Sequence, residues 1–130
     1  MTVNILYLSI GAILGALLRF AVTHLSSESS HHRGFPHGTL IVNVVGSLIV
    51  GFVLTSTEDH SHDPWRMFAA TGFCGSFTTF SAFAYESMGY LRQGRLGTFA
   101  LNVALNNILC VLAVVLGTYL HSAGRNGIVR

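Results

Sequence analysis

Four long apolar runs dominate the chain, and short polar stretches separate them. The runs cover residues 3–24, 38–56, 65–91 and 96–121. A helix needs roughly 20 apolar residues to cross the hydrocarbon core of a bilayer, so each run is about long enough. The pattern predicts an all-α membrane protein with four transmembrane helices, which form a single domain over residues 1–130.

The third run differs from the others in its middle, which reads Thr71-Gly-Phe-Cys-Gly-Ser-Phe-Thr-Thr-Phe-Ser81. This is a poor helix interior, because glycine costs about 1 kcal/mol relative to alanine and Ser and Thr divert backbone hydrogen bonds. A break in a membrane helix is tolerated where the freed backbone groups meet protein, water or ions. We therefore expect a broken third helix, a feature that often marks an ion site.

Composition also indicates a lipid environment. Apolar residues make up 51% of the chain and charged residues 9%, whereas soluble domains are about a quarter charged. Seven arginines, no lysine, five acids and two cysteines argue against a disulfide scaffold and a nucleic-acid-binding arm, so no nucleic-acid partner is expected. The first run lacks the basic start and cleavage site of a signal peptide, and we expect it to stay attached.

The arginines are nearly balanced across the predicted membrane. Four spans put both termini on one side, together with three arginines, Arg66, Arg125 and Arg130. The other side has Arg33, Arg92 and Arg95, and also Arg19 if it is assigned there. The positive-inside rule then gives a bias of one charge at most. The chain can insert in both orientations, which would allow two subunits to pair antiparallel, or in one orientation under a weak bias.

Several polar side chains lie within the predicted spans. A charge inside a span costs roughly 2.5–3.5 kcal/mol on insertion scales, so Arg19 is a candidate for a cation that attracts anions into a water-filled vestibule. Arg19 also lies near a span end, where it could reach the interface instead. Asn43, Asn102 and Asn106 could join helices by hydrogen bonds of about 0.6 kcal/mol each. With the hydroxyls of the third run they could instead form a polar track for an ion of either sign.

Four phenylalanines of the third run recur at helical spacing, namely Phe73, Phe77, Phe80 and Phe83. Such a stripe is typical of a core or of a lipid-facing surface. Because the edge of a phenyl ring is positive, the same stripe could line a pore for an anion. Glu86 follows on that face, and the sequence leaves its role open.

The remaining motifs indicate packing rather than chemistry. Gly11-x-x-x-Gly15 and Ser47-x-x-x-Gly51 have the small-residue spacing that lets membrane helices approach closely. Histidines in the polar stretches, His31, His32, His60 and His62, fit a solvated surface better than a metal site. No nucleophile, base and orienting residue occur together, and no phosphate-binding loop is present, so we do not expect an enzyme.

Three segments carry a resemblance to a known family. They are Gly15-Ala-Leu-Leu-Arg19-Phe20, Gly38-Thr-Leu-Ile-Val-Asn43-Val-Val-Gly46 and Gly72-Phe-Cys-Gly-Ser-Phe-Thr-Thr-Phe-Ser-Ala-Phe-Ala-Tyr-Glu86. Together they resemble the Fluc (CrcB) family of fluoride channels. The resemblance implies a four-helix subunit inserted in both orientations in the bacterial plasma (inner) membrane, an antiparallel homodimer, two fluoride pores, and a structural sodium ion at the dimer centre.

The resemblance also implies roles for individual residues. The backbone carbonyls of Gly75 and Thr78 match those that hold the sodium ion, and Arg19 matches an arginine near the vestibule. The resemblance implies that the pore residues are Asn43, Thr79, Phe80, Ser81 and Phe83. The polarity of the fourth run adds Asn102 and Asn106 to them. In many relatives Asn102 and Asn106 are replaced by Tyr and Ser, so their contact with the ion stays open.

The sequence also departs from the family pattern in the third run, where Ser76 stands in place of a common Gly, and Ala82 and Ala84 in place of Thr and Ser.

The function that the resemblance implies is passive export of cytoplasmic fluoride, which relieves its toxicity. A proton-coupled multidrug exporter of the small dual-topology type is the alternative, but such exporters need an acid in the first span. A non-transporting membrane scaffold is the third possibility.

Overall fold

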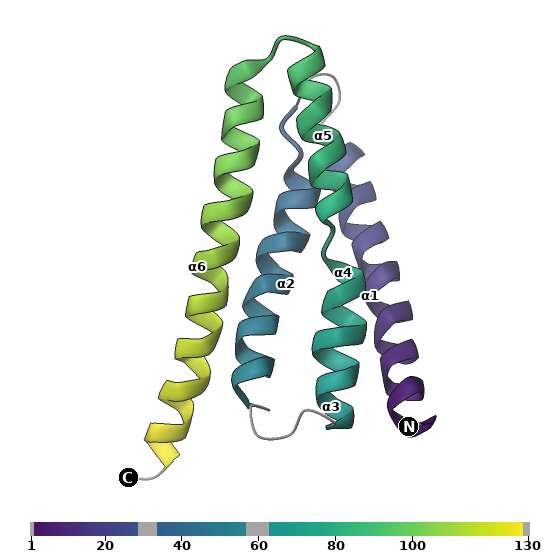
Figure 1. Cartoon of the computed structure of the whole chain (residues 1–130), viewed down its shortest axis with the longest axis vertical. Helices are drawn as coiled ribbons and strands as arrows, with labels where there is room; N and C mark the ends of the chain where they lie inside the picture. The colour runs from purple at the N-terminus through teal and green to yellow at the C-terminus, as the bar shows by residue number, and fades with distance from the viewer. Residues whose placement is uncertain (1, 29–33, 57–62, 129–130) are drawn as a thin grey trace.

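The computed structural model describes residues 2–28, 34–56 and 63–128, and those residues contain helices and loops but no strand. The helices form rods that stand side by side, and the chain runs alternately up and down through them (Figure 1). Helix α1 (Thr2–Glu28) and helix α2 (His37–Ser56) form the first two rods. Helix α6 (Leu96–Ile128) forms the last, and both chain ends lie at the same end of the bundle (Figure 1).

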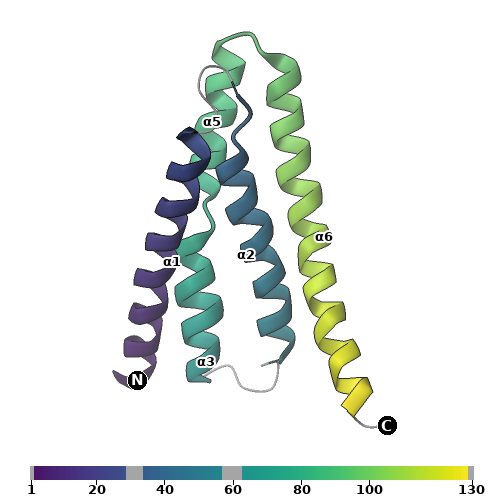
Figure 2. The same ribbon diagram turned by 180° about the vertical axis from the view of Figure 1, so that it is seen from behind.

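Three of the rods are long and apolar enough to cross a membrane, over Thr2–Ser26, His37–Ser56 and Leu96–Gly124. Helices α1 and α6 lie on the outside of the bundle, with α2 between them when it is seen from behind (Figure 2). Most of the large apolar side chains of α1 and α6 are exposed. Surfaces of this kind are stable against lipid rather than water.

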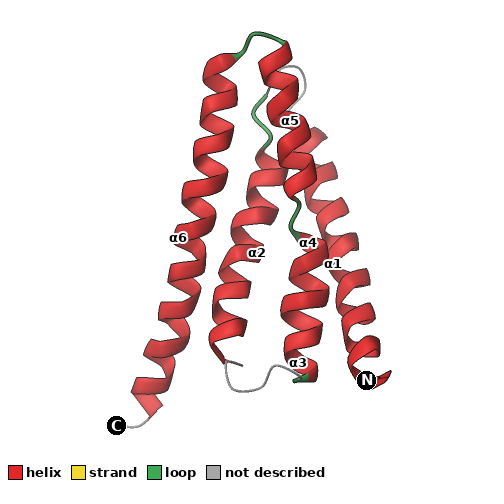
Figure 3. Ribbon diagram, in the orientation of Figure 1, coloured by secondary structure: helices red, strands yellow, loops and turns green. Residues whose placement is uncertain are grey.

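The remaining rod is assembled from several short helical segments. It begins with α3 (Pro64–Arg66), continues as the π-helix η1 (Met67–Cys74) and α4 (Gly75–Phe77), and ends with α5 (Phe80–Arg92). Asp63 caps its start, because the carboxylate accepts a hydrogen bond from the backbone N–H of Trp65 at 2.8 Å. A loop separates α4 from α5 (Figure 3). In that loop Thr78 and Thr79 have extended backbone, with ψ angles of 158° and 108°.

Glycines allow α1 to lie directly against the segmented rod. A Cβ atom on Gly11 would overlap the carbonyl oxygen of Phe68, and one on Gly15 would overlap that of Phe73. Gly72 returns the contact, since its Cβ would overlap the carbonyl oxygen of Leu8 on α1. The close approach predicted for Gly11 and Gly15 is therefore confirmed.

A second glycine contact joins α2 to α6. A Cβ atom on Gly51 would overlap the backbone of Val114, and one on Gly117 would overlap the carbonyl oxygen of Leu48. Sequence spacing predicts the α2 half of this contact, and on α6 Ala113-x-x-x-Gly117 has the same small-residue spacing, although it is not among the predicted motifs. The bundle is thus held by backbones in van der Waals contact, and few large side chains are buried within it.

Replacing Gly15 by alanine tests the first of these contacts. The added methyl group has no space, so we expect Gly15→Ala to destabilise the folded protein by about 1–3 kcal/mol, a typical cost of overpacking. The measurement is thermal unfolding of the purified protein in detergent. Gly89→Ala is the matched control, because nothing lies within 4 Å of the added atom, and alanine in a helix interior stabilises by roughly 0.5–1 kcal/mol. An unchanged unfolding temperature for Gly15→Ala would contradict this packing.

Candidate functional site

Two cavities meet at the loop between α4 and α5. The first, which we call the vestibule, has a volume of about 620 Å³ and lies between α1, the start of α2 and α5. Its polar lining includes Arg19, Thr39, Thr79, Ser81 and Glu86. The second, which we call the groove, has a volume of about 340 Å³ and lies between α2, α5 and α6. Its lining includes Asn43, Thr78, Phe80, Phe83, Asn106 and Cys110.

The vestibule contains one cation and one acid that the structure describes. Arg19 comes from α1 and Glu86 from α5, and no ion pair between the two is seen in the described ranges. Glu86 instead accepts a hydrogen bond at Oε1 from the hydroxyl of Thr39, at 2.6 Å. Its other oxygen, Oε2, is buried and has no partner among the described residues. The sequence alone leaves the role of Glu86 open and does not single out Thr39.

A clamp made by Asn43 and Thr79 separates the vestibule from the groove. The backbone N–H of Thr79 donates to Oδ1 of Asn43 at 2.8 Å, and Nδ2 of Asn43 donates back to the carbonyl oxygen of Thr79 at 3.3 Å. Asn43 lines the groove and Thr79 lines the vestibule. A Cβ atom on Gly46 would overlap Cγ2 of Thr78, so this glycine lets the extended segment lie against α2.

The start of α5 depends on the hydroxyl of Thr79. Its Oγ1 accepts a hydrogen bond from the backbone N–H of Ala82 at 3.2 Å, as an N-cap side chain does. The hydroxyl of Ser81 lies 3.2 Å from the same Oγ1. The two hydroxyls predicted to face an ion are therefore adjacent, and both line the vestibule.

The loop also leaves backbone carbonyls without their helical donors, among them those of Gly75 and Thr78. In a continuous helix the N–H of Thr79 would donate to the carbonyl of Gly75, and that of Ala82 to the carbonyl of Thr78. Here Thr79 donates to Asn43, and Ala82 donates to the hydroxyl of Thr79. Within residues 2–28, 34–56 and 63–128, no donor replaces them at Gly75 or Thr78. These are the two carbonyls that the family resemblance assigns to a sodium ion.

Amide side chains continue the hydrogen bonding from Asn43 into α6. Nδ2 of Asn43 also donates to Oδ1 of Asn106 at 3.0 Å, and Nδ2 of Asn106 donates to Oδ1 of Asn102 at 3.0 Å. Asn106 lines the groove, whereas Asn102 is 0% exposed and lines neither the groove nor the vestibule. Asn102 donates to the hydroxyl of Ser87 at 3.0 Å. No local sequence signal singles out Ser87, because its contact with Asn102 joins two helices across a turn.

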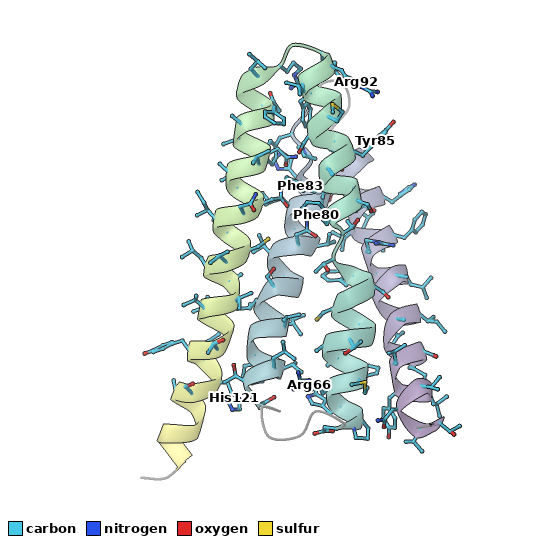
Figure 4. All side chains as sticks on the ribbon, viewed as in Figure 1. Arg66, Phe80, Phe83, Tyr85, Arg92 and His121 are labelled. Atoms are coloured by element: carbon cyan, nitrogen blue, oxygen red, sulfur yellow. The ribbon has the colours of Figure 1, made fainter. Side chains whose placement is uncertain are left out.

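The four phenylalanines form two pairs rather than the predicted single stripe. Phe73 and Phe77 stack with ring centroids 5.4 Å apart, and Phe77 is buried at 2% exposure. Phe80 and Phe83 form the second pair, also with centroids 5.4 Å apart, and line the groove (Figure 4). The single stripe is wrong because the extended residues between Phe77 and Phe80 end the helical register.

The cysteines and histidines have simpler environments. Cys74 is buried, Cys110 is partly exposed in the groove, and both are free thiols. The described part of the chain contains no group of three His, Cys, Asp or Glu side chains that could hold a metal. His31, His32, His60 and His62 lie outside the described residues.

Comparison of the amino-acid sequence with known proteins places this chain in a family. A model of the family described as "CrcB-like protein, Camphor Resistance (CrcB)" matches residues 6–118. The chain belongs to the CrcB family. A relative from Koribacter versatilis is 48% identical over 85% of this CrcB chain and 88% of its own length. Relatives from Shewanella amazonensis and Opitutus terrae are 42% and 40% identical over 90% and 95% of this chain, and over 94% and 95% of their own.

All three relatives bear the name "Fluoride-specific ion channel FluC". The matched region includes α2, the loop between α4 and α5, and both cavities' polar residues. With three helices long and apolar enough to span a bilayer, this CrcB chain is a multi-pass membrane protein.

Proposed function

We propose that the protein is a fluoride-selective ion channel that lets fluoride leave the cytoplasm passively and so relieves its toxicity. Its relatives are named as fluoride-specific channels and not as enzymes. The observation that carries the proposal is the meeting of two cavities at the Asn43–Thr79 clamp. An anion that crosses this point passes from a vestibule with a cation to a groove lined by amides and phenyl rings.

The polar groups along this path suit a small, strongly hydrated anion. Fluoride must exchange its water for other close donors, or the cost of dehydration stops it. The hydroxyls of Thr79 and Ser81 lie at the vestibule side of the clamp, and Asn43 and Asn106 lie at the groove side. Arg19 raises the local concentration of anions without a direct role in the narrow part, because a single charge acts over several ångströms. Contact of Asn102 with the ion stays a sequence-based prediction, and the path proposed here does not need it, because Asn102 is buried and lines neither cavity.

Phe80 and Phe83 supply the next donors on this path. The rim of a phenyl ring carries partial positive charge, so ring edges attract an anion while the apolar rings exclude most cations and water. Phe83 is only 8% exposed, whereas Phe80 is 78% exposed in the single subunit. A pore wall formed by Phe80 therefore needs a second surface opposite it.

A second copy of the chain, inserted in the opposite orientation, supplies that surface in our proposal. The nearly balanced arginines allow both orientations. An antiparallel homodimer about an axis in the membrane plane gives two equivalent pores. It also brings the broken third spans of the two subunits together, since Gly75 is exposed on the outside of its rod. We place this dimer in the bacterial plasma (inner) membrane, where it would connect the cytoplasm with the exterior.

The carbonyls of Gly75 and Thr78 fit a structural sodium ion at the dimer centre. Both lack a donor in the described structure, and a hard cation prefers oxygen ligands of this kind. Two carbonyls from each subunit would give four ligands. A sodium ion held there would supply positive charge that balances the carbonyl dipoles, and the chain's own contribution is to hold those carbonyls free by means of Asn43 and Thr79.

Ion-selective efflux from proteoliposomes tests the proposed function. Vesicles containing the purified protein should release fluoride rapidly and retain chloride, because a selective path must replace the water of the smaller ion with close donors. The efflux should be lower when sodium is replaced by a larger organic cation on both sides. Equal release of both anions, or no release of fluoride in sodium, would contradict the channel.

Substitution of the ring pair tests its role in the path. Phe80→Ile and Phe83→Ile keep an apolar side chain but remove the ring edge, and we expect each to abolish fluoride efflux. Size-exclusion chromatography should show the same assembly as for the unchanged protein. Phe73→Ile is the matched control, since Phe73 pairs with Phe77 away from the groove, and it should keep its efflux. Normal efflux in both Phe80→Ile and Phe83→Ile would refute the ring-edge role.

A further inference from the structure

Ser87 and Asn102 form a buried hydrogen-bonded pair behind the groove. Ser87 lies on α5 at 5% exposure, and Asn102 lies on α6 at 0% exposure. Neither residue lines the vestibule or the groove. Nδ2 of Asn102 donates to Oγ of Ser87 at 3.0 Å, and the Ser87 hydroxyl donates to the backbone carbonyl of Phe83 at 2.7 Å. A pair buried this completely acts on the ion path through its neighbours.

The pair is one end of a series of hydrogen bonds that all run in one donor-to-acceptor direction, from the N–H of Thr79 to the carbonyl of Phe83. At this end, the carbonyl of Phe83 can only accept, so the Ser87 hydroxyl is its donor and leaves its lone pairs for Asn102. At the other end, the backbone N–H of Thr79 can only donate, so Asn43 must turn Oδ1 toward it. Each amide between them donates through Nδ2 to its neighbour's oxygen. The backbone groups at the two ends of the series therefore require the same donor-to-acceptor direction.

This direction decides which atoms of the groove amides face one another. Asn106 places Nδ2 between the side-chain and backbone oxygens of Asn102, at 3.0 and 3.1 Å, and turns Oδ1 toward Asn43. If Asn102 rotated by half a turn, its Nδ2 would meet the Nδ2 of Asn106. Asn106 would then have to rotate as well and would oppose Nδ2 of Asn43. The hydroxyl of Ser87 prevents this sequence of rotations by holding Asn102.

We propose that Ser87 and Asn102 are positioning residues that fix the amide orientations of Asn106 and Asn43, and thereby hold Asn43 in its clamp on Thr79, where the two cavities meet. This rests on the proposed path through the groove. Ser87 acts from a site that the anion does not reach, and its effect passes through Asn102 and Asn106 in turn. Effects carried through one shared side chain do not add when that side chain is removed.

Efflux measurements on single and double variants test this proposal. Ser87→Ala removes the acceptor of Asn102, and Asn102→Ala removes the link while Ser87 keeps its bond to Phe83. Each should lower fluoride efflux roughly tenfold, the loss that corresponds to one buried hydrogen bond. Ser87→Thr keeps the hydroxyl and should restore most of the efflux. In a background of Asn106→Ala, which itself lowers efflux, Ser87→Ala should cause no further loss.

Ser122→Ala is the matched control. Ser122 makes the same bond to the carbonyl four residues earlier, to Thr118 at 3.1 Å, but on the exposed surface of α6, and its removal should leave efflux unchanged. Size-exclusion chromatography verifies that each variant is assembled. If Ser87→Ala does not assemble, the efflux of Asn102→Ala tests the positioning role. Wild-type efflux in both single variants, or losses that multiply in the double variant, would overturn the positioning role alone. Wild-type efflux in Asn106→Ala would overturn it together with the proposed path.

Discussion

The pair of hydrogen bonds between Asn43 and the backbone of Thr79 is the interaction on which the rest of the structure depends. In hydrocarbon an unpaired backbone group costs several kcal/mol, so a helical rod can change to extended backbone only where another group replaces its bonds. One carboxamide replaces both, as acceptor for the N–H and donor to the carbonyl. Without it, the extended residues Thr78 and Thr79 would have no reason to persist inside the bundle.

Three features of the site follow from that local exchange of partners. The carbonyls of Gly75 and Thr78 lose their donors, the hydroxyl of Thr79 becomes the cap of α5, and the ring of Phe80 turns into the groove rather than continuing the line of Phe77. Gly46 supports all three, because any side chain there would displace Thr78. The glycine contacts of α1 and α6 hold the neighbouring rods close enough for these short bonds to form.

Much of the helical architecture could be predicted from the sequence, because long apolar runs and Gly-x-x-x-Gly spacing are local signals. Polarity in apolar surroundings also singles out Asn43 and Thr79 in the sequence, but it does not predict the contact between them. The register of Phe77 and Phe80 was not predictable, because it depends on two residues whose backbone is set by a contact from another helix. The same holds for Ser87 with Asn102 and for Thr39 with Glu86, which meet only after the helices pack.

The central claim is that the anion crosses the bundle at the Asn43–Thr79 clamp, and fluoride efflux through Asn43→Asp tests it most directly. Aspartate has nearly the same shape and keeps an oxygen for the N–H of Thr79, but it loses both Nδ2 donors and introduces negative charge on the path. The account predicts an assembled protein in which fluoride efflux is abolished. An assembled Asn43→Asp protein that releases fluoride as fast as the unchanged protein would contradict it.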